Sequence, residues 1–149
     1  LDPKGLVGVM DYLGRKPSAN THADMAASLE HIVVGFENVP KSRWMEEALK
    51  HFPDDGNGLN ITYDPKLRDA VEAGGEIPDL WPFFDALAGK PLCCLRGAGS
   101  DLLSSGTLTK MQARRPDMTT ATIPDRGHIP FLDEPESLKA LNTWIDTMV

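Results

Sequence analysis

Apolar and polar positions follow two different patterns along the chain. In the first third, apolar residues recur every three or four positions, the spacing of one face of an amphipathic helix. This spacing predicts three helices. The first covers residues 2–13, the second follows a start signal at Ser18 to Thr21 and continues through Phe36 to end before Pro40, and the third covers about 42–52. The second helix carries Phe36 and the third carries Trp44 on its predicted buried face. Three consecutive short helices before any strand-like segment indicate a separate helical region.

The turn-rich segment Pro53-Asp54-Asp55-Gly56-Asn57-Gly58 marks the end of this region, because glycine, proline and aspartate favour tight turns. We therefore divide the chain into a helical region, residues 1–60, and a second region, residues 61–149. A short β-leaning segment at 59–63 spans this boundary, and a weak helix at 65–73 follows it.

An aromatic-rich stretch at residues 77–87 leads to the first long strand. Its large rings include Trp81 and Phe84. Such rings either anchor a connection to the core or line a substrate pocket, and the sequence leaves both interpretations open.

Two strand-length segments in the last third are followed by glycine-containing turns. Residues 91–96 form an apolar run without alternation, which is typical of a strand covered on both faces, and residues 118–123 are rich in β-branched side chains. A helix is predicted between them, from Ser104 or Ser105 to Arg114-Arg115. A strand–helix–strand unit with short connections predicts a parallel crossover, so the fold class is α/β.

A last helix is predicted after the second strand. Asp133 and Glu136 have the spacing of a capping box at its start. Its predicted buried stripe consists of Leu138, Leu141, Trp144, Ile145 and Met148.

Asp101 and His128 follow the ends of these two strands. Neighbouring strands lie about 4.8 Å apart, so side chains just beyond their carboxyl ends can meet. A carboxylate bonded to one ring nitrogen would leave the other nitrogen free to act as a base. Either residue alone is more often structural, but together they predict a shared site.

Composition and charge narrow the classes of partner. The chain is 41% apolar and 25% charged, and its net charge of -7 without a basic cluster argues against a nucleic-acid partner. No apolar run approaches the roughly 20 residues of a membrane helix, and nothing resembles a signal peptide, so we expect no membrane partner.

The cysteine and histidine positions predict neither a metal nor another cofactor. Cys93 and Cys94 are adjacent in a strand and point to opposite faces, which favours two small buried side chains in a reducing, cytoplasmic setting. His22, His31 and His51 fall in different helical segments, away from metal-ligand spacing.

Three motifs together resemble a known family. They are Leu95-Arg96-Gly97, Ser100-Asp101-Leu102-Leu103-Ser104 and Gly127-His128-Ile129-Pro130-Phe131-Leu132-Asp133-Glu134-Pro135. In this order the chain resembles the cap and C-terminal half of an α/β-hydrolase-fold enzyme. The resemblance implies that residues 1–60 are the helical cap, that the two strands are the seventh and eighth, and that Asp101 and His128 are the acid and base of a catalytic triad. If the cap covers the site, Phe36 and Trp44 are candidates for contact with a small-molecule substrate. Trp81 and Phe84 of the aromatic stretch are candidates as well.

The chain departs from this family in lacking the Gly-x-Ser-x-Gly elbow that carries the nucleophile. Ser100 is preceded by Gly99 and followed by Asp101, so it does not fit that elbow. We therefore expect a nucleophile outside this chain and an incomplete, inactive chain when alone. The expected partner is the N-terminal half of the same protein, or a second copy that pairs with the open strand edge. A serine nucleophile would favour ester or carbon–carbon cleavage, and an aspartate would favour epoxide or haloalkane opening.

Two other functions compete with hydrolysis of a small ester or related carbonyl compound. Gly97-Ala98-Gly99 could start a dinucleotide-binding fingerprint, but Leu102 occupies the place of its third glycine. The second alternative is a non-catalytic interaction domain that keeps the hydrolase architecture.

Overall fold

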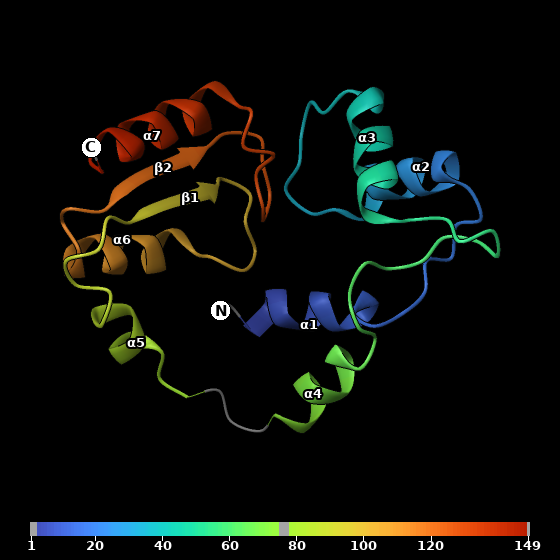
Figure 1. The fold of residues 1–149 in the computed structure, drawn as a ribbon, viewed down its shortest axis with the longest axis horizontal. Helices are drawn as coiled ribbons and strands as arrows, with labels where there is room; N and C mark the ends of the chain where they lie inside the picture. The colour runs from blue at the N-terminus through green and yellow to red at the C-terminus, as the bar shows by residue number, and fades with distance from the viewer. Residues whose placement is uncertain (1–2, 75–77, 149) are drawn as a thin grey trace. The chain divides into compact units, whose positions relative to one another are not determined.

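The computed structural model describes residues 3–74 and 78–148, with side chains from residue 7 onward. The helices and strands in these ranges are α1 (Pro3–Tyr12), α2 (His22–Ile32), α3 (Lys41–His51), α4 (Leu67–Ala73), α5 (Trp81–Asp85), β1 (Cys93–Gly97), α6 (Ser105–Arg114), β2 (Thr119–Ile123) and α7 (Pro135–Asp146) (Figure 1). The described residues form two compact units. One unit contains residues 3–4, Val34–Glu37 and 78–148, and the other contains residues 5–33 and 38–74.

The first unit is built on a parallel pair of strands, as the sequence predicts. β1 and β2 pair in register from Cys93 opposite Thr119 to Gly97 opposite Ile123. The helix α6 lies on one face of this pair and α7 on the other (Figure 1). Ile123, at the end of β2, is fully buried.

The N-terminal capping residue predicted for α6 is confirmed, whereas the one predicted for α7 is wrong. Ser104 Oγ accepts a hydrogen bond of 3.0 Å from the N–H of Thr107, which satisfies one free donor of the first turn. The N-cap of α7 is Glu134, one residue later than Asp133, so Asp133 and Glu136 do not form the predicted capping box.

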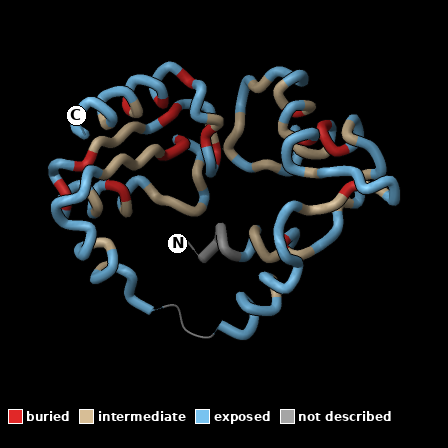
Figure 2. The backbone as a smooth tube through the Cα atoms, viewed as in Figure 1, coloured by how far each residue is buried: buried red, intermediate tan, exposed pale blue. Residues whose placement is uncertain are grey.

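The buried face of α7 also differs from the predicted stripe. Its buried residues are the small Ser137 and Ala140, while Leu138, Ile145 and Met148 are 48%, 47% and 49% exposed. Small side chains let a helix approach a sheet closely, and this two-stranded sheet covers only part of the helix surface. Figure 2 shows the buried positions on the sheet side of α7 and at the strand ends.

Arg115 anchors the connection that enters β1. Its guanidinium is buried and donates to Leu87 O at 2.6 Å and to Lys90 O at 2.7 Å. It also donates to both carboxylate oxygens of Asp117, at 2.8 and 2.6 Å, which lowers the pKa of Asp117. The buried charge is thus compensated by four hydrogen bonds, and it fixes residues 87–90 against the end of α6.

The second unit contains the packed pair α2 and α3. Thr21 caps α2 by accepting from the N–H of Asp24 at 3.1 Å, as expected from the start signal in the sequence. The predicted continuation of α2 to Phe36 is wrong, because the helix ends at Ile32 and Gly35 has a φ of 80°. This left-handed conformation, which favours glycine, turns the chain out of the helix.

A second set of contacts in this unit joins α1 to the segment before α4. Arg68 Nη1 donates to Met10 O at 2.7 Å and Leu13 O at 3.1 Å, carbonyls at the C-terminal end of α1.

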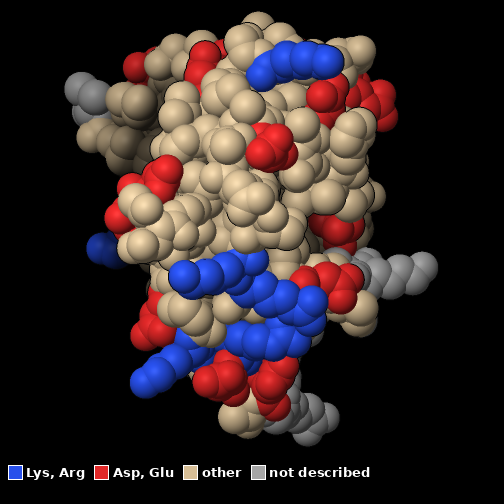
Figure 3. Space-filling view, turned by 90° about the vertical axis from the view of Figure 1, so that its right-hand side faces the viewer, with Lys and Arg blue, Asp and Glu red and all other residues tan. Residues whose placement is uncertain are grey.

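The β-leaning segment 59–63 forms no strand; its pairing among the described residues is an isolated bridge between Asp54 and Leu59. On the face drawn in Figure 3, a band of Lys and Arg side chains lies next to Asp and Glu side chains.

Candidate functional site at the carboxyl ends of the paired strands

Backbone hydrogen bonds hold the turns after β1 and β2 together. The N–H of Ala98 donates to Ile123 O at 2.8 Å and extends the strand ladder by one residue. The N–H of Gly99 then donates to Arg126 O at 2.9 Å. The chain segments that carry Asp101 and His128 therefore run side by side, as the ends of neighbouring parallel strands do.

Four glycines allow the backbones around this site to touch. A Cβ at Gly97 would collide with the carbonyl oxygens of Arg126 and Gly127, and one at Gly127 would collide with Val34 O and come within 2.7 Å of the Phe36 ring. Gly35 and Gly99 meet in the same way, with 2.7 Å between a Cβ at Gly99 and the Cα of Gly35. These contacts bring the segment Val34–Glu37 against the two strand ends.

We expect Gly127→Ala to destabilise this region strongly, because backbone and a packed ring cannot move away from the new methyl group without breaking other contacts. The free energy of unfolding should fall by roughly 3 kcal/mol, the upper range for overpacking. Gly106→Ala is the matched control, because that helical position is exposed and open, and alanine should stabilise it by about 0.5–1 kcal/mol. Urea unfolding of the two variants in the assembled protein measures both changes, and equal effects would contradict the close approach.

His128 is exposed beyond the end of β2 and contacts Ser100. Its Nδ1 lies 3.3 Å from Ser100 Oγ, and among the described residues the structure gives Nε2 no hydrogen bond. Ser100 Oγ also accepts from the N–H of Leu103 at 3.1 Å, which fixes the hydroxyl in place. If Nδ1 carries the proton and donates it to an oxygen, the lone pair of Nε2 is free to accept a proton.

Asp101 is the next residue in the chain and is exposed. Its loop is held by the buried Arg96, whose Nε donates to Leu103 O at 2.6 Å and whose Nη2 donates to Ser100 O at 3.4 Å. Within the described residues, the structure gives no hydrogen bond between Asp101 and His128. The carboxylate–imidazole bond of the triad therefore stays a prediction, and the adjacent Ser100 is the partner that the sequence did not indicate.

Phe36 is the predicted substrate contact that lies against Gly127, in the first unit. Its ring packs on Phe131 with centroids 5.1 Å apart, and it approaches Gly127, the residue before His128. The peptide of Glu37 donates to Asp125 O at 3.1 Å and secures this segment further. Phe36 thus packs against the backbone just before His128, although not as part of a helix, and its contact with substrate stays a prediction.

Trp81 and Phe84 lie in α5, on the side of the sheet where the strands begin (Figure 1). Their rings contact each other edge to face at 5.8 Å, and the guanidinium of Arg114 lies 4.5 Å over the ring of Trp81. Arg114 also pairs with Asp85 at 2.6 Å. These contacts favour the anchoring interpretation of the aromatic stretch, and a role of the two rings in substrate binding stays a prediction.

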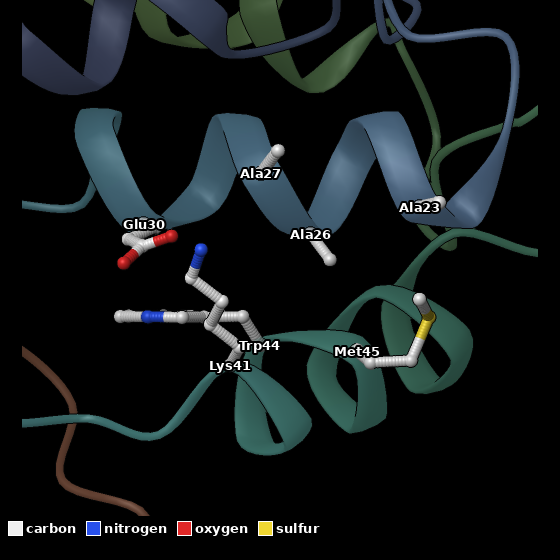
Figure 4. Close-up of a pocket in the computed structure, with 7 residues that line it drawn as sticks. All are labelled: Ala23, Ala26, Ala27, Glu30, Lys41, Trp44 and Met45. Atoms are coloured by element: carbon white, nitrogen blue, oxygen red, sulfur yellow. The ribbon is translucent and has the colours of Figure 1, made fainter.

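Trp44 belongs to the second unit, where it is buried between α2 and α3. It lines a pocket of about 200 Å³ together with Ala23, Ala26, Ala27, Glu30, Lys41 and Met45. Figure 4 shows Lys41 and Glu30 facing each other at one end of this pocket, beside the Trp44 ring. A contact of Trp44 with substrate is likewise still a prediction.

The other polar clusters show no metal-binding arrangement in the described ranges, where no group of three His, Cys, Asp or Glu side chains converges. His22 Nε2 instead contacts Phe52 O at 2.8 Å, and His51 pairs with Glu47 at 3.2 Å. Cys93 and Cys94 are free thiols whose pKa values are raised by burial. None of the described helices is long and apolar enough to span a bilayer.

Comparison with known proteins connects this geometry to hydrolases. No protein-family model matches the chain. It is 31% identical over 150 residues to a 3-hydroxybutyrate-oligomer hydrolase of Cupriavidus necator (strain ATCC 17699 / DSM 428 / KCTC 22496 / NCIMB 10442 / H16 / Stanier 337), a match that covers 93% of this chain and 50% of that protein.

Solved structures give the same answer. An alpha/beta hydrolase from Novosphingobium aromaticivorans DSM 12444 superposes with a TM-score of 0.86 and 34% identity, covering 97% of this chain and 52% of that one. The E-2-(acetamidomethylene)succinate hydrolase superposes with a TM-score of 0.67 and 25% identity, covering 94% and 53%. Fold and sequence together identify this chain as part of an α/β-hydrolase fold. Its parallel strand pair with flanking helices matches the C-terminal part of that fold, and the chain spans about half the length of these relatives.

Proposed function

We propose that this chain supplies the base and the acid of a hydrolase that cleaves small esters or related carbonyl compounds. The observation that supports this most directly is the exposed imidazole of His128, with Nδ1 beside Ser100 Oγ and Nε2 without a hydrogen bond in the described residues. Asp101 is the proposed acid that orients the ring and stabilises its protonated form. The nucleophile would come from residues outside this chain, on the N-terminal half of the same protein.

In the proposed reaction, His128 Nε2 removes the proton from the nucleophile as it attacks the carbonyl carbon. The resulting imidazolium then gives that proton to the leaving alcohol, which departs and leaves an acyl group on the nucleophile. Water attacks this acyl group in the second half of the reaction, again with His128 as the base. The acid is released and the nucleophile is regenerated.

The names of the relatives favour a carbonyl substrate over an epoxide or a haloalkane. One relative is named for oligomers of a hydroxy acid, which are joined by ester bonds, and another for an acetamidomethylene succinate. These names support a serine nucleophile and a substrate that itself carries a carboxylate. We also propose that residues 1–60 act as a cap over the site, and that the protein works in the cytoplasm, in line with its two free cysteines.

Hydrolysis of a small panel of esters by the assembled protein tests this function. We expect turnover of 4-nitrophenyl acetate, 4-nitrophenyl butyrate and the dimer of 3-hydroxybutyrate, together with labelling by a fluorophosphonate probe. Phe36→Ala should lower kcat/KM for the hydroxybutyrate dimer by about tenfold and for the acetate by much less, because a lost apolar contact affects the larger substrate. No turnover and no labelling would favour the alternative of a non-catalytic interaction domain.

A further inference from the structure

The loop between β2 and α7 is organised around the carboxylate of Glu134. This side chain is only 6% exposed. Its Oε1 accepts from Arg126 Nε and from the N–H of Phe131, both at 2.9 Å. Its Oε2 accepts from the N–H of Leu132 at 3.0 Å and from Ser137 Oγ at 2.8 Å. One carboxylate therefore joins residues on both sides of His128.

Arg126 extends these contacts to the segment that carries Phe36. Its Nη1 donates to Glu37 O at 3.2 Å and to Asp125 O at 2.8 Å. Its guanidinium also lies 5.3 Å over the ring of Phe131, which in turn packs on Phe36. The ion pair of Glu134 and Arg126 thus holds the loop that presents the imidazole. Through Arg126 it also contacts the ring of Phe131.

Glu134 does more than end the loop at a helix. It occupies the N-cap position of α7, yet its side chain accepts no capping hydrogen bond from a backbone N–H of the first helical turn. Two of its acceptor bonds instead go to loop peptides, and Leu132 has a φ of 73° that those bonds help to hold. Burial disfavours the charged carboxylate, but the hydrogen bonds from Ser137, the loop peptides and Arg126 outweigh it and lower the pKa of Glu134.

We propose that Glu134, through Arg126 and the peptides of Phe131 and Leu132, is the positioning residue that sets the orientation of His128. This inference rests on the proposed catalytic role of His128. A misplacement of about 1 Å at a reacting group can lower a rate about 100-fold, so a loop fixed by four converging donors has a direct effect on turnover. A carboxylate is required, because its two oxygens accept all four bonds at once and a neutral amide offers only one oxygen.

Glu134→Gln tests the proposal in the assembled protein. The amide nitrogen must face one pair of donors, so that pair loses its acceptor. We expect kcat for 4-nitrophenyl acetate to fall about 10- to 100-fold with little change in KM. Glu136→Gln is the matched control, because Glu136 is exposed two positions further along α7 and should leave kcat unchanged.

A readout on the imidazole separates this proposal from the catalytic one. In protein carrying ¹³C-labelled histidine, the ring C–H resonance of His128, assigned by its loss in His128→Ala, should shift or broaden in Glu134→Gln and stay in place in Glu136→Gln. If that change occurs but the wild-type protein hydrolyses no ester, the positioning role stands and the proposed function falls. If the resonance and kcat are both unchanged in Glu134→Gln, the positioning role is wrong.

Ser137→Ala serves as the second variant if Glu134→Gln does not fold. It removes one of the four donors and keeps the carboxylate, so a smaller change of the same kind is expected, about two- to fivefold in kcat. A normal kcat and an unmoved His128 resonance in a folded Ser137→Ala protein would count against the proposal.

Discussion

Replacing His128 with alanine in the assembled enzyme should lower kcat for a minimal ester by roughly 10⁴-fold or more, because in the proposed reaction this imidazole takes the proton from the nucleophile. The free energy of unfolding should change by less than about 0.5 kcal/mol, since the side chain is exposed. Steady-state hydrolysis and urea unfolding of the same preparations measure the two quantities. His31→Ala is the control, an exposed histidine in α2 whose loss should leave kcat unchanged.

Two further variants identify the group that orients the imidazole. Asp101→Asn should reduce kcat by several orders of magnitude if the carboxylate stabilises the protonated ring, whereas Ser100→Ala should reduce it by less than tenfold. An equal or larger effect of Ser100→Ala would mean that the hydroxyl 3.3 Å from Nδ1 is the functional partner. A His128→Ala protein that loses stability as well as activity would show instead that the residue is structural.

The strands and α6 were predictable because their signals are local. The apolar run at residues 91–96 and the β-branched run at 118–123 lie within two residues of the observed β1 and β2. The Ser104 cap likewise needs only its own next three residues. Local patterns of this kind determine an element before any tertiary contact forms, which is why their positions are close to those in the structure.

The errors occur where distant contacts decide the local structure. Apolar spacing carries the predicted α2 through to Phe36, but Gly35 turns the chain so that its backbone can meet Gly99. The large apolar residues of α7 have helical spacing, yet the sheet is contacted by the small Ser137 and Ala140. In each case the partner lies far away in the sequence, so periodicity alone cannot identify it.

The candidate site shows the same division. The positions of Asp101 and His128 after consecutive strands indicate that they belong to one region, and glycine at positions 97, 99 and 127 is a visible signal of close backbone approach. The roles of Ser100, Arg96 and Glu134 depend on hydrogen bonds within loops, and the sequence does not reveal how these loops fold. For Trp81, the sequence does not reveal the contact of its ring with Arg114 at the end of α6.

The strand pair and α7 leave apolar groups that another part of a hydrolase fold would cover. β1 pairs with β2 on one side, and among the described residues no strand pairs with its other edge. Leu138 and Ile145 on α7, and Met148 just after it, are about half exposed. An unpaired edge on an apolar strand favours aggregation unless it is covered. The chain also spans about half the length of the relatives it matches, and our proposal of a second, nucleophile-bearing half would account for both features.

We therefore expect residues 1–149, produced alone, to be insoluble or oligomeric and to hydrolyse no ester above the uncatalysed rate. Co-expression with the nucleophile-bearing half should restore a soluble assembly and turnover, since that half provides both the covering strand and the nucleophile. Size-exclusion chromatography with light scattering measures the assembly, and release of 4-nitrophenol measures turnover. The matched control carries His128→Ala in the 149-residue chain, which should assemble equally well and remain inactive. A monomeric 149-residue chain that unfolds cooperatively and shows His128-dependent turnover by itself would contradict the need for a second half, because the chain would then contain its own nucleophile.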